Sequence, residues 1–327
     1  MAYSLNSRKV QKVLRVNRSA LIKESCMRRL RNIAGLVLLL ALSGACLAGE
    51  TVLVCGVTGR QGTAVAEELL ARGYTVRGMT RKPSSQEARA MAEKGVAIVE
   101  GDYGNPQSLL AAMQGADKLF FYSGFSANEL QEGLNVIQAA KDTGIKYVVY
   151  SSGAAAEPGV GVAGSDKAKV ELALIDSGLP YTVLRPVAFM ENFDRQQKRT
   201  ASMGIIDSRA PDRQLYFIAI RDIGMLAGES FDHPELWSGK AMNIAGDSMS
   251  VQQYVDTFSK VMGRPVKYTQ MPLDEYLAAM PKPLRPLFRW YDEVGYTADV
   301  EALRKRYPDM ITLEQYLRTT GWADWQE

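Results

Sequence analysis

The chain has 327 residues, of which 46% are hydrophobic, enough for one large domain or for one large and one small domain. Its formal net charge is +3, but nine of the 39 basic residues and one of the 36 acidic residues lie before residue 49, so the remaining 30 basic and 35 acidic residues give the rest a net charge of −5. An acidic body with no clustered basic stripe lacks the electrostatic footprint of a nucleic-acid-binding protein, and we expect no nucleic-acid partner.

The first 48 residues are typical of a targeting segment. From Met27 the sequence reads MRRLRNIAGLVLLLALSGACLAGE, a basic stretch followed by an apolar run and small residues, which is the pattern of an export signal. The apolar run is about 15 residues long, whereas a membrane-spanning helix needs roughly 20. We expect cleavage near Ala45 or Ala48 and an exported (periplasmic or secreted) protein, with Met27 rather than Met1 as the start.

Three alternatives for this segment remain open. The sequence SGAC at 43–46 resembles a lipoprotein cleavage box that would lipidate Cys46, although a serine replaces the expected leucine. Arg28 and Arg29 suggest a twin-arginine signal, a route that exports folded, cofactor-loaded proteins. An uncleaved segment would instead tether a cytoplasmic domain to the membrane. Membrane contact is expected only through this segment.

Beyond residue 49, short β-rich runs alternate with helical stretches. The sequence predicts strands at 51–57, 74–80, 96–100, 118–122, 146–151 and 181–184. It predicts helices at 62–72, 84–94, 106–114, 128–142 and 167–177, each followed by a glycine, at positions 73, 95, 115, 144 and 178. This alternation predicts an α/β fold of the Rossmann class, with a doubly wound parallel sheet covered by helices on both faces.

Past residue 185 the regular alternation stops. The sequence there predicts strands at 241–245 and 266–270 and helices at 251–262, 273–280 and 313–319. We therefore expect three parts: the N-terminal segment 1–48, a dinucleotide-binding domain 49–185, and a smaller substrate-covering subdomain 186–327 packed on it.

Cysteine and histidine are too sparse for a disulfide framework or a metal site. Cys26 and Cys46 fall in the N-terminal segment, and Cys55 lies inside the first apolar strand. The lone histidine, His233, lies in a loop beside no other cluster of ligand-type residues, so we expect no metal.

The segment VLVCGVTGRQG places Gly56, Gly59 and Gly62 between the first strand and its helix. Glycines at this spacing let the backbone turn sharply and approach a pyrophosphate, while the helix N-terminus offers amide donors and positive potential. We therefore predict that this loop, including Thr58, Arg60 and Gln61, binds a dinucleotide.

The end of the second strand favours NADP (NADPH) over NAD. An NAD-preferring fold usually places an acid there to bind the ribose hydroxyls, but this chain has Thr80, Arg81 and Lys82. The planar guanidinium of Arg81 suits a 2′-phosphate, with Arg60 as a second candidate. The alternative is that these are only solvated loop charges. From its position after the third strand, Asp102 is expected to contact the adenine.

Several motifs together resemble the NmrA-like branch of the atypical short-chain dehydrogenase/reductases. These motifs are the glycine turn, the Thr-Arg ending of the second strand, EGD at 100–102, SGLPYTVLRP at 177–186 and FMENF at 189–193. The likeness extends from residue 51 to about 322. It implies binding of NADP or NAD, and the family includes both reductases and redox-sensing regulators.

The Tyr-x-x-x-Lys pair of the wider superfamily is missing. None of the 15 tyrosines has a lysine four residues later, and Ala163 stands four residues before Lys167, where the resemblance places the family's lysine. Lys167 is therefore our candidate both for catalysis and for holding the nicotinamide ribose, and Ser123 is a further candidate cofactor contact. The alternative is a solvated Lys167 in the first turn of a helix.

Candidate substrate-pocket residues are Ser151, Ser152, Phe189 and Asn192. The two serines follow the fifth strand, at the edge where open α/β sheets bind ligands, although either could cap a local turn. We expect a reductase that uses NADPH to reduce a small electron-poor acceptor such as a quinone, enone or dye. The alternatives are a redox-sensing NADP(H)-binding protein and a nonenzymatic assembly factor. The oligomeric state is left open.

Overall fold

A seven-stranded, wholly parallel sheet organises the computed structural model, which describes residues 49–124, 126–194, 200 and 203–323. The strand order is β10-β6-β5-β4-β1-β2-β3. The strands are β1 (Thr51–Cys55), β2 (Thr75–Thr80), β3 (Ala97–Glu100), β4 (Lys118–Tyr122), β5 (Tyr147–Ser151), β6 (Tyr181–Pro186) and β10 (Lys240–Ile244). Its first six strands follow the Rossmann order 3-2-1-4-5-6, which confirms the predicted fold class.

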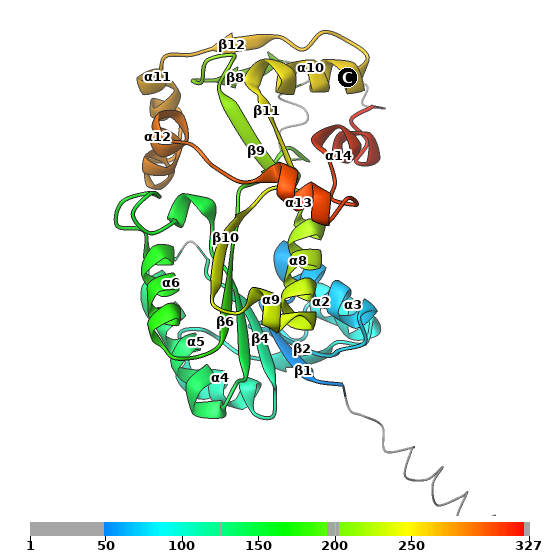
Figure 1. The fold of residues 1–327 in the computed structure, drawn as a ribbon, viewed down its shortest axis with the longest axis vertical. Helices are drawn as coiled ribbons and strands as arrows, with labels where there is room; N and C mark the ends of the chain where they lie inside the picture. Colours follow the sequence, from blue (N-terminus) through cyan, green and yellow to red (C-terminus); the bar gives the residue numbers. More distant parts are fainter. Residues whose placement is uncertain (1–48, 125, 195–199, 201–202, 324–327) are drawn as a thin grey trace, which may run out of the picture. The chain divides into compact units, whose positions relative to one another are not determined.

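Two layers of helices cover the faces of this sheet (Figure 1). Along β1, Val52 and Val54 pack against one layer, whereas Leu53 and Cys55 pack against the other, as expected for alternating side chains of a strand. The first layer holds α2 (Arg60–Ala71), α3 (Gln86–Glu93) and α8 (Ile220–Asp232); the second holds α4 (Pro106–Met113), α5 (Glu129–Thr143) and α6 (Asp166–Asp176). The sheet is therefore buried on both sides.

The predicted ends of the first five helices agree closely with the structure. Helix α5, for example, ends at Gly144, whose φ of 74° lies in the left-handed region that glycine adopts without strain. The four other glycines predicted to end helices also have positive φ.

A second group of elements lies beyond the carboxyl end of β6, because that strand continues directly into β7 (Ala188–Phe189). It contains the sheets β11-β9-β7 and β12-β8. Phe193, Phe217, Tyr254, Phe258 and Trp322 form its aromatic core. The bounds of its elements are β8 (Ile205–Asp207), β9 (Gln214–Ile218), β11 (Asp247–Ser250), β12 (Tyr268–Gln270), α10 (Val251–Met262), α11 (Leu273–Ala278), α12 (Arg285–Glu293) and α14 (Leu313–Thr319). Two further helices, α9 (Pro234–Trp237) and α13 (Val300–Arg306), contribute Trp237 and Leu303 to the core of the main sheet.

The elements β10 and α8, although they lie beyond residue 185, also belong to the main sheet and its covering helices. The strand predicted at 241–245 is β10, which pairs in parallel with β6, and α8, which we did not predict, packs on α2. A strand's pairing partner is not visible in its local sequence pattern, so the sequence could not place β10. The predicted boundary at residue 185 remains a prediction.

The predicted targeting segment lies outside the described residues. Among the helices that the structure does describe, none has the length and apolar character needed to cross a membrane.

Candidate functional site

The carboxyl ends of β1 and β4 lie side by side, and their connections leave toward opposite faces of the sheet. This is the topological switch point of the fold, where open α/β sheets bind ligands. The glycine turn follows β1 and Ser123 follows β4, while Arg81 follows β2 and Ser151 ends β5. The structure therefore brings most of the predicted site residues to one edge of the sheet, which we call the carboxyl edge.

Close backbone packing explains the glycines of the turn that follows β1. Gly56 has a φ of 65°, and the Gly59 amide donates to its carbonyl oxygen at 2.9 Å. A Cβ on Gly62 would lie 2.2 Å from that same oxygen, closer than real contacts allow. Gly62 therefore permits the start of α2 to pack directly on the turn.

Tyr122, at the end of β4, imposes a second requirement for glycine, which the sequence analysis missed. Its hydroxyl donates to the Gly56 carbonyl at 3.1 Å. A Cβ on Gly56 or Gly59 would lie 2.6 or 2.3 Å from that hydroxyl. Two glycines of the motif thus accommodate a neighbouring side chain as well as any ligand that approaches the turn.

The N-terminus of α2 has no side-chain cap. The N-cap residue is Gly59, which has no side chain to accept from the first-turn amides. The first amides of a helix lack intrahelical acceptors and carry partial positive charge, so the amides of Arg60, Gln61 and Gly62 suit an anion such as a diphosphate. Thr58 flanks the turn, with its hydroxyl 3.4 Å from that of Thr80.

The two arginine candidates differ in their surroundings. Arg81 is exposed and makes no hydrogen bond or ion pair with any residue in the described part of the chain, so its guanidinium can receive a phosphate. Arg60 instead donates to the Glu191 carbonyl oxygen at 3.2 Å. The carboxylate of Asp102 accepts from the Gly104 amide at 2.8 Å within its own exposed loop, and its contact with the adenine remains a prediction.

Lys167 lies at the start of α6 and reaches across to the loop after β4. Its ammonium donates to the backbone oxygen and the hydroxyl of Ser123, and to Glu129 Oε1 at 2.6 Å. The Lys167 side chain is only 14% exposed, so it is not a solvated first-turn residue. Sequence reasoning did not find Glu129, which lies 38 positions away on another helix.

Burial and the neighbouring carboxylate shift the pKa of Lys167 in opposite directions. Loss of solvent lowers the pKa of its ammonium, and the neighbouring Glu129 carboxylate raises it. The Ser123 hydroxyl lies 2.9 Å from the hydroxyl of Tyr150, whose burial raises the pKa of the phenol. Tyr150 is 0% exposed and stacks on Phe121, so it does not replace the missing tyrosine as a group that touches substrate.

The predicted substrate-pocket residues occupy different environments. Ser151 donates to Gln61 Oε1 at 2.7 Å and so links β5 to α2. The Ser152 hydroxyl is buried with no hydrogen-bond partner among the described residues. Phe189 is half-buried in β7, whereas Asn192 is exposed in the single turn η2 (Met190–Asn192). Of this set, the two serines lie at the carboxyl edge.

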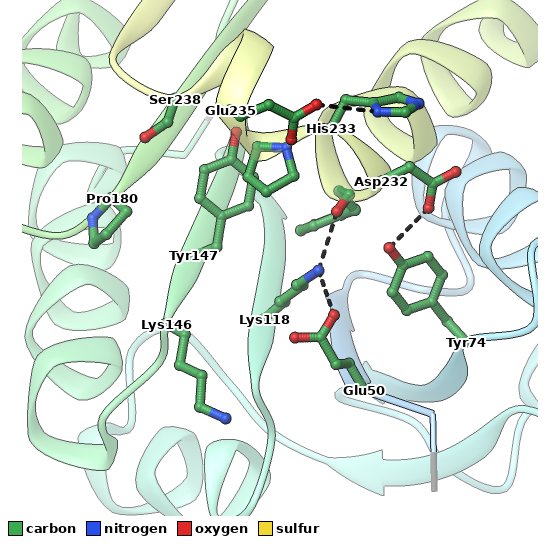
Figure 2. A pocket seen from close by; sticks show the side chains of 12 residues that line it. Glu50, Tyr74, Lys118, Lys146, Tyr147, Pro180, Asp232, His233, Glu235 and Ser238 are labelled. Carbon is green, nitrogen blue, oxygen red and sulfur yellow. Dashed lines mark hydrogen bonds and ion pairs between the residues drawn. The ribbon is translucent and has the colours of Figure 1, made fainter. Parts of the chain in front are cut away.

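A cavity with a volume of about 720 Å³ lies at the opposite edge of the main sheet (Figure 2). Its lining includes Glu50 and Lys146, which precede β1 and β5, and Lys118, which begins β4. The buried Lys118 ammonium is bonded to Glu50 at 2.6 Å and to the Phe231 carbonyl at 3.0 Å. This cavity is therefore separate from the predicted cofactor residues.

His233 also lines that cavity, with Nδ1 3.3 Å from Glu235 Oε1. Within the described ranges, no three histidine, cysteine, aspartate or glutamate side chains are grouped closely enough to hold a metal ion.

Comparison with known proteins gives consistent matches. Quinone oxidoreductase 2 of Escherichia coli (strain K12) is 27% identical over 233 residues, covering 70% of this chain and 80% of that protein. The crystal structure of E. coli NADPH-dependent quinone oxidoreductase QOR2 with NADPH is similar with a TM-score of 0.73 at 24% identity, covering 82% and 99% of the two chains. NmrA, a negative transcriptional regulator in complex with NADP, is similar with a TM-score of 0.71 at 20% identity, covering 83% and 95%.

At these identities the two solved structures establish a shared fold and not a shared activity. The sequence model of the NmrA-like family matches residues 48–317, a span that includes the glycine turn, Arg81, Ser123 and Lys167. This match confirms the predicted family: the chain belongs to the NmrA-like family.

Proposed function

We propose that this protein is an NADPH-dependent reductase of a small electron-poor acceptor, with a quinone as the leading candidate. The observation that carries the proposal is the uncapped N-terminus of α2 behind the glycine turn, at the switch point of the sheet. Such a terminus is a ready anion site for a dinucleotide diphosphate. The E. coli relative described above is itself a quinone oxidoreductase.

Each part of the cofactor has a candidate partner at the carboxyl edge. The amides of Arg60, Gln61 and Gly62 would hold the diphosphate, and the exposed guanidinium of Arg81 would hold the 2′-phosphate. Lys167 and Ser123 would bind the ribose next to the nicotinamide. Bound NADPH supplies the hydride.

The acceptor class follows from the missing tyrosine. Reduction of an isolated ketone creates a strongly basic alkoxide that needs a proton donor in the site. Ala163 and the fully buried Tyr150 do not supply one. A quinone gives a delocalised hydroquinone anion, which takes its proton from water or from the Lys167 ammonium.

The test follows NADPH absorbance with the purified full-length protein and a panel of quinones, enals and dyes. We expect quinone-dependent oxidation of NADPH. A protein that binds NADPH but oxidises it with no member of the panel would contradict the enzymatic proposal.

A redox-sensing role is the second candidate, favoured by the absence of the tyrosine. Calorimetry with NADPH and NADP⁺ would separate the two, because a sensor needs different affinities for the two forms to shift its own state. A strong preference for one form without turnover would support the sensor.

We also propose that the N-terminal segment exports the protein or tethers it to a membrane. The support is the basic, apolar and small-residue pattern of residues 27–50. Cell fractionation with N-terminal sequencing of the mature chain tests it, and a chain found in the cytoplasm with residues 27–48 intact would contradict it.

A further inference from the structure

We propose that Glu129 is a positioning residue of this site, which keeps the Lys167 ammonium charged and directed at the carboxyl edge. The inference rests on the proposed function for its importance in catalysis. The contact between the two side chains does not depend on that function.

The two acidic residues in the first turn of α5 differ in burial and in their hydrogen-bond partners. Glu129 is 7% exposed, and its carboxylate lies 2.6 Å from the Lys167 ammonium. Glu132 is half-exposed and accepts from the Ser126 hydroxyl at 2.8 Å. An acid in the first turn of a helix is favourable without being buried, so the helix alone does not explain the burial of Glu129.

Burying a carboxylate is costly unless it is paired, and a buried amine without a partner tends to lose its proton. The other carboxylates near Lys167 on α6 are engaged elsewhere. Asp166 pairs with Lys169 at 2.8 Å, and Glu171 is bonded by the guanidinium of Arg185. The phenol of Tyr150, which reaches Lys167 through Ser123, stays neutral because burial raises its pKa.

Glu129 therefore offsets the desolvation that lowers the pKa of Lys167. A charged ammonium has three N–H donors, so Lys167 can keep Glu129 and one oxygen of Ser123 and donate to one ribose hydroxyl, whereas a neutral amine has only two and donates more weakly. Glu129 would thus determine the pH above which Lys167 stops holding the cofactor.

The experiment compares Glu129→Gln with Glu132→Gln, which removes a carboxylate from the same helical turn without touching Lys167. The reaction of Lys167 with an acylating reagent is followed by peptide mass spectrometry across pH in the cofactor-free protein. We expect Glu129→Gln to lower the midpoint of this profile by at least about one pH unit, roughly a tenfold gain in reactivity at a fixed pH below the midpoint. Glu132→Gln should leave it unchanged, and equal profiles for the two variants would overturn the proposal.

Glu129→Asp covers the case in which Glu129→Gln does not fold. It keeps the charge but withdraws the carboxylate by one methylene, so a smaller downward shift is expected, and a midpoint equal to that of the parent protein would overturn the proposal. Glu129→Gln should weaken NADPH binding several-fold at pH 8 to 9 and much less at pH 6. The reason is that an ion pair shifts the pKa of a buried group by about 1 to 3 units, so the unpaired lysine loses its proton at a lower pH. When Lys167 is already replaced in Lys167→Met, Glu129→Gln should not weaken NADPH binding further. An equally large weakening in that background would overturn the proposed role of Glu129.

The failure of the proposed function would be distinguishable. If the parent protein bound no nicotinamide nucleotide, the proposed function would be contradicted. A lowered acylation midpoint in Glu129→Gln would still support the role of Glu129, and an unchanged midpoint would still overturn it.

Discussion

Asp222, in the first turn of α8, should make the protein less stable as pH rises from about 4 to about 6. The residue is 0% exposed, its Oδ2 accepts from the Ile311 amide at 2.8 Å, and its Oδ1 has no hydrogen-bond partner among the described residues. Burial raises the pKa of this carboxyl from 3.8 to about 6. An unfolded chain then loses its proton first, so ionisation favours the unfolded state.

The size of the effect follows from that shift. At about 1.4 kcal/mol per pKa unit, a rise from 3.8 to about 6 corresponds to at most about 3 kcal/mol of unfolding free energy. The loss begins above about pH 4, is complete slightly above pH 6, and adds nothing further at higher pH. Partial solvation of the carboxylate would reduce this loss of unfolding free energy toward about 1 kcal/mol.

Urea unfolding of the parent protein and of Asp222→Asn, at pH values from 4 to 7.5, measures this contribution. The asparagine oxygen can still accept from the Ile311 amide, but the side chain no longer titrates. The stability difference between the two proteins should therefore change by about 1 to 3 kcal/mol in favour of the variant as pH rises. A difference that stays constant across this pH range would refute the reasoning, whatever its absolute value.

Substitutions at three other positions test the site and the packing behind it. Lys82→Ala is the control at the arginine, and Gly153→Ala is the control for the two glycines, because a Cβ there meets nothing within 4 Å. Arg81→Ala should weaken NADPH binding about 10- to 100-fold, as expected for the loss of a charged hydrogen bond of about 1.5 to 3 kcal/mol, and should change NADH binding little. Lys82→Ala should weaken NADPH binding less, and a parent protein that prefers NADH would contradict the role of Arg81. Gly62→Ala should abolish NADPH binding in a fluorescence titration, because its Cβ would lie 2.2 Å from the Gly56 carbonyl. An unchanged affinity for NADPH would contradict the close packing of the turn on the helix. Gly224→Ala should lower the free energy of unfolding in urea by about 1 to 3 kcal/mol, because its Cβ would lie 2.7 Å from the Ala64 carbonyl on α2. A decrease no larger than that of the control would show that the two helices can separate freely.

The local pattern predicted the elements of the main sheet well and long-range contacts poorly. Alternating hydrophobicity and helix-ending glycines are local signals, so strands such as Lys118–Tyr122 and helices such as Val251–Met262 were found at or near their true ends. Helix α8 was missed because Gly224 and Gly228 interrupt its helical pattern, and these glycines pack closely against α2 only in the fold. The position of β10 beside β6 depends on a pairing that no local pattern encodes.

The same distinction applies to the site. Lys167 and Ser123 were identified separately, and the structure places them in direct contact. Glu129 and Tyr122 were not identified, because a first-turn glutamate and a strand-ending tyrosine are ordinary in sequence, and only the fold brings them to Lys167 and to the glycine turn. The charged partner that tunes a predicted lysine was therefore the part that sequence could not supply.

The buried ion pair also bears on which reactions this edge can perform. A lysine held against a carboxylate releases its proton less readily than an unpaired buried lysine, so Lys167 is better suited to binding than to donating a proton in each turnover. Tyr150 is close to it through Ser123, but its ring is enclosed by the sheet and by Phe121 and does not reach a ligand. Both features favour an acceptor whose reduced form tolerates a negative charge until water protonates it, which is a property of quinones and not of simple ketones.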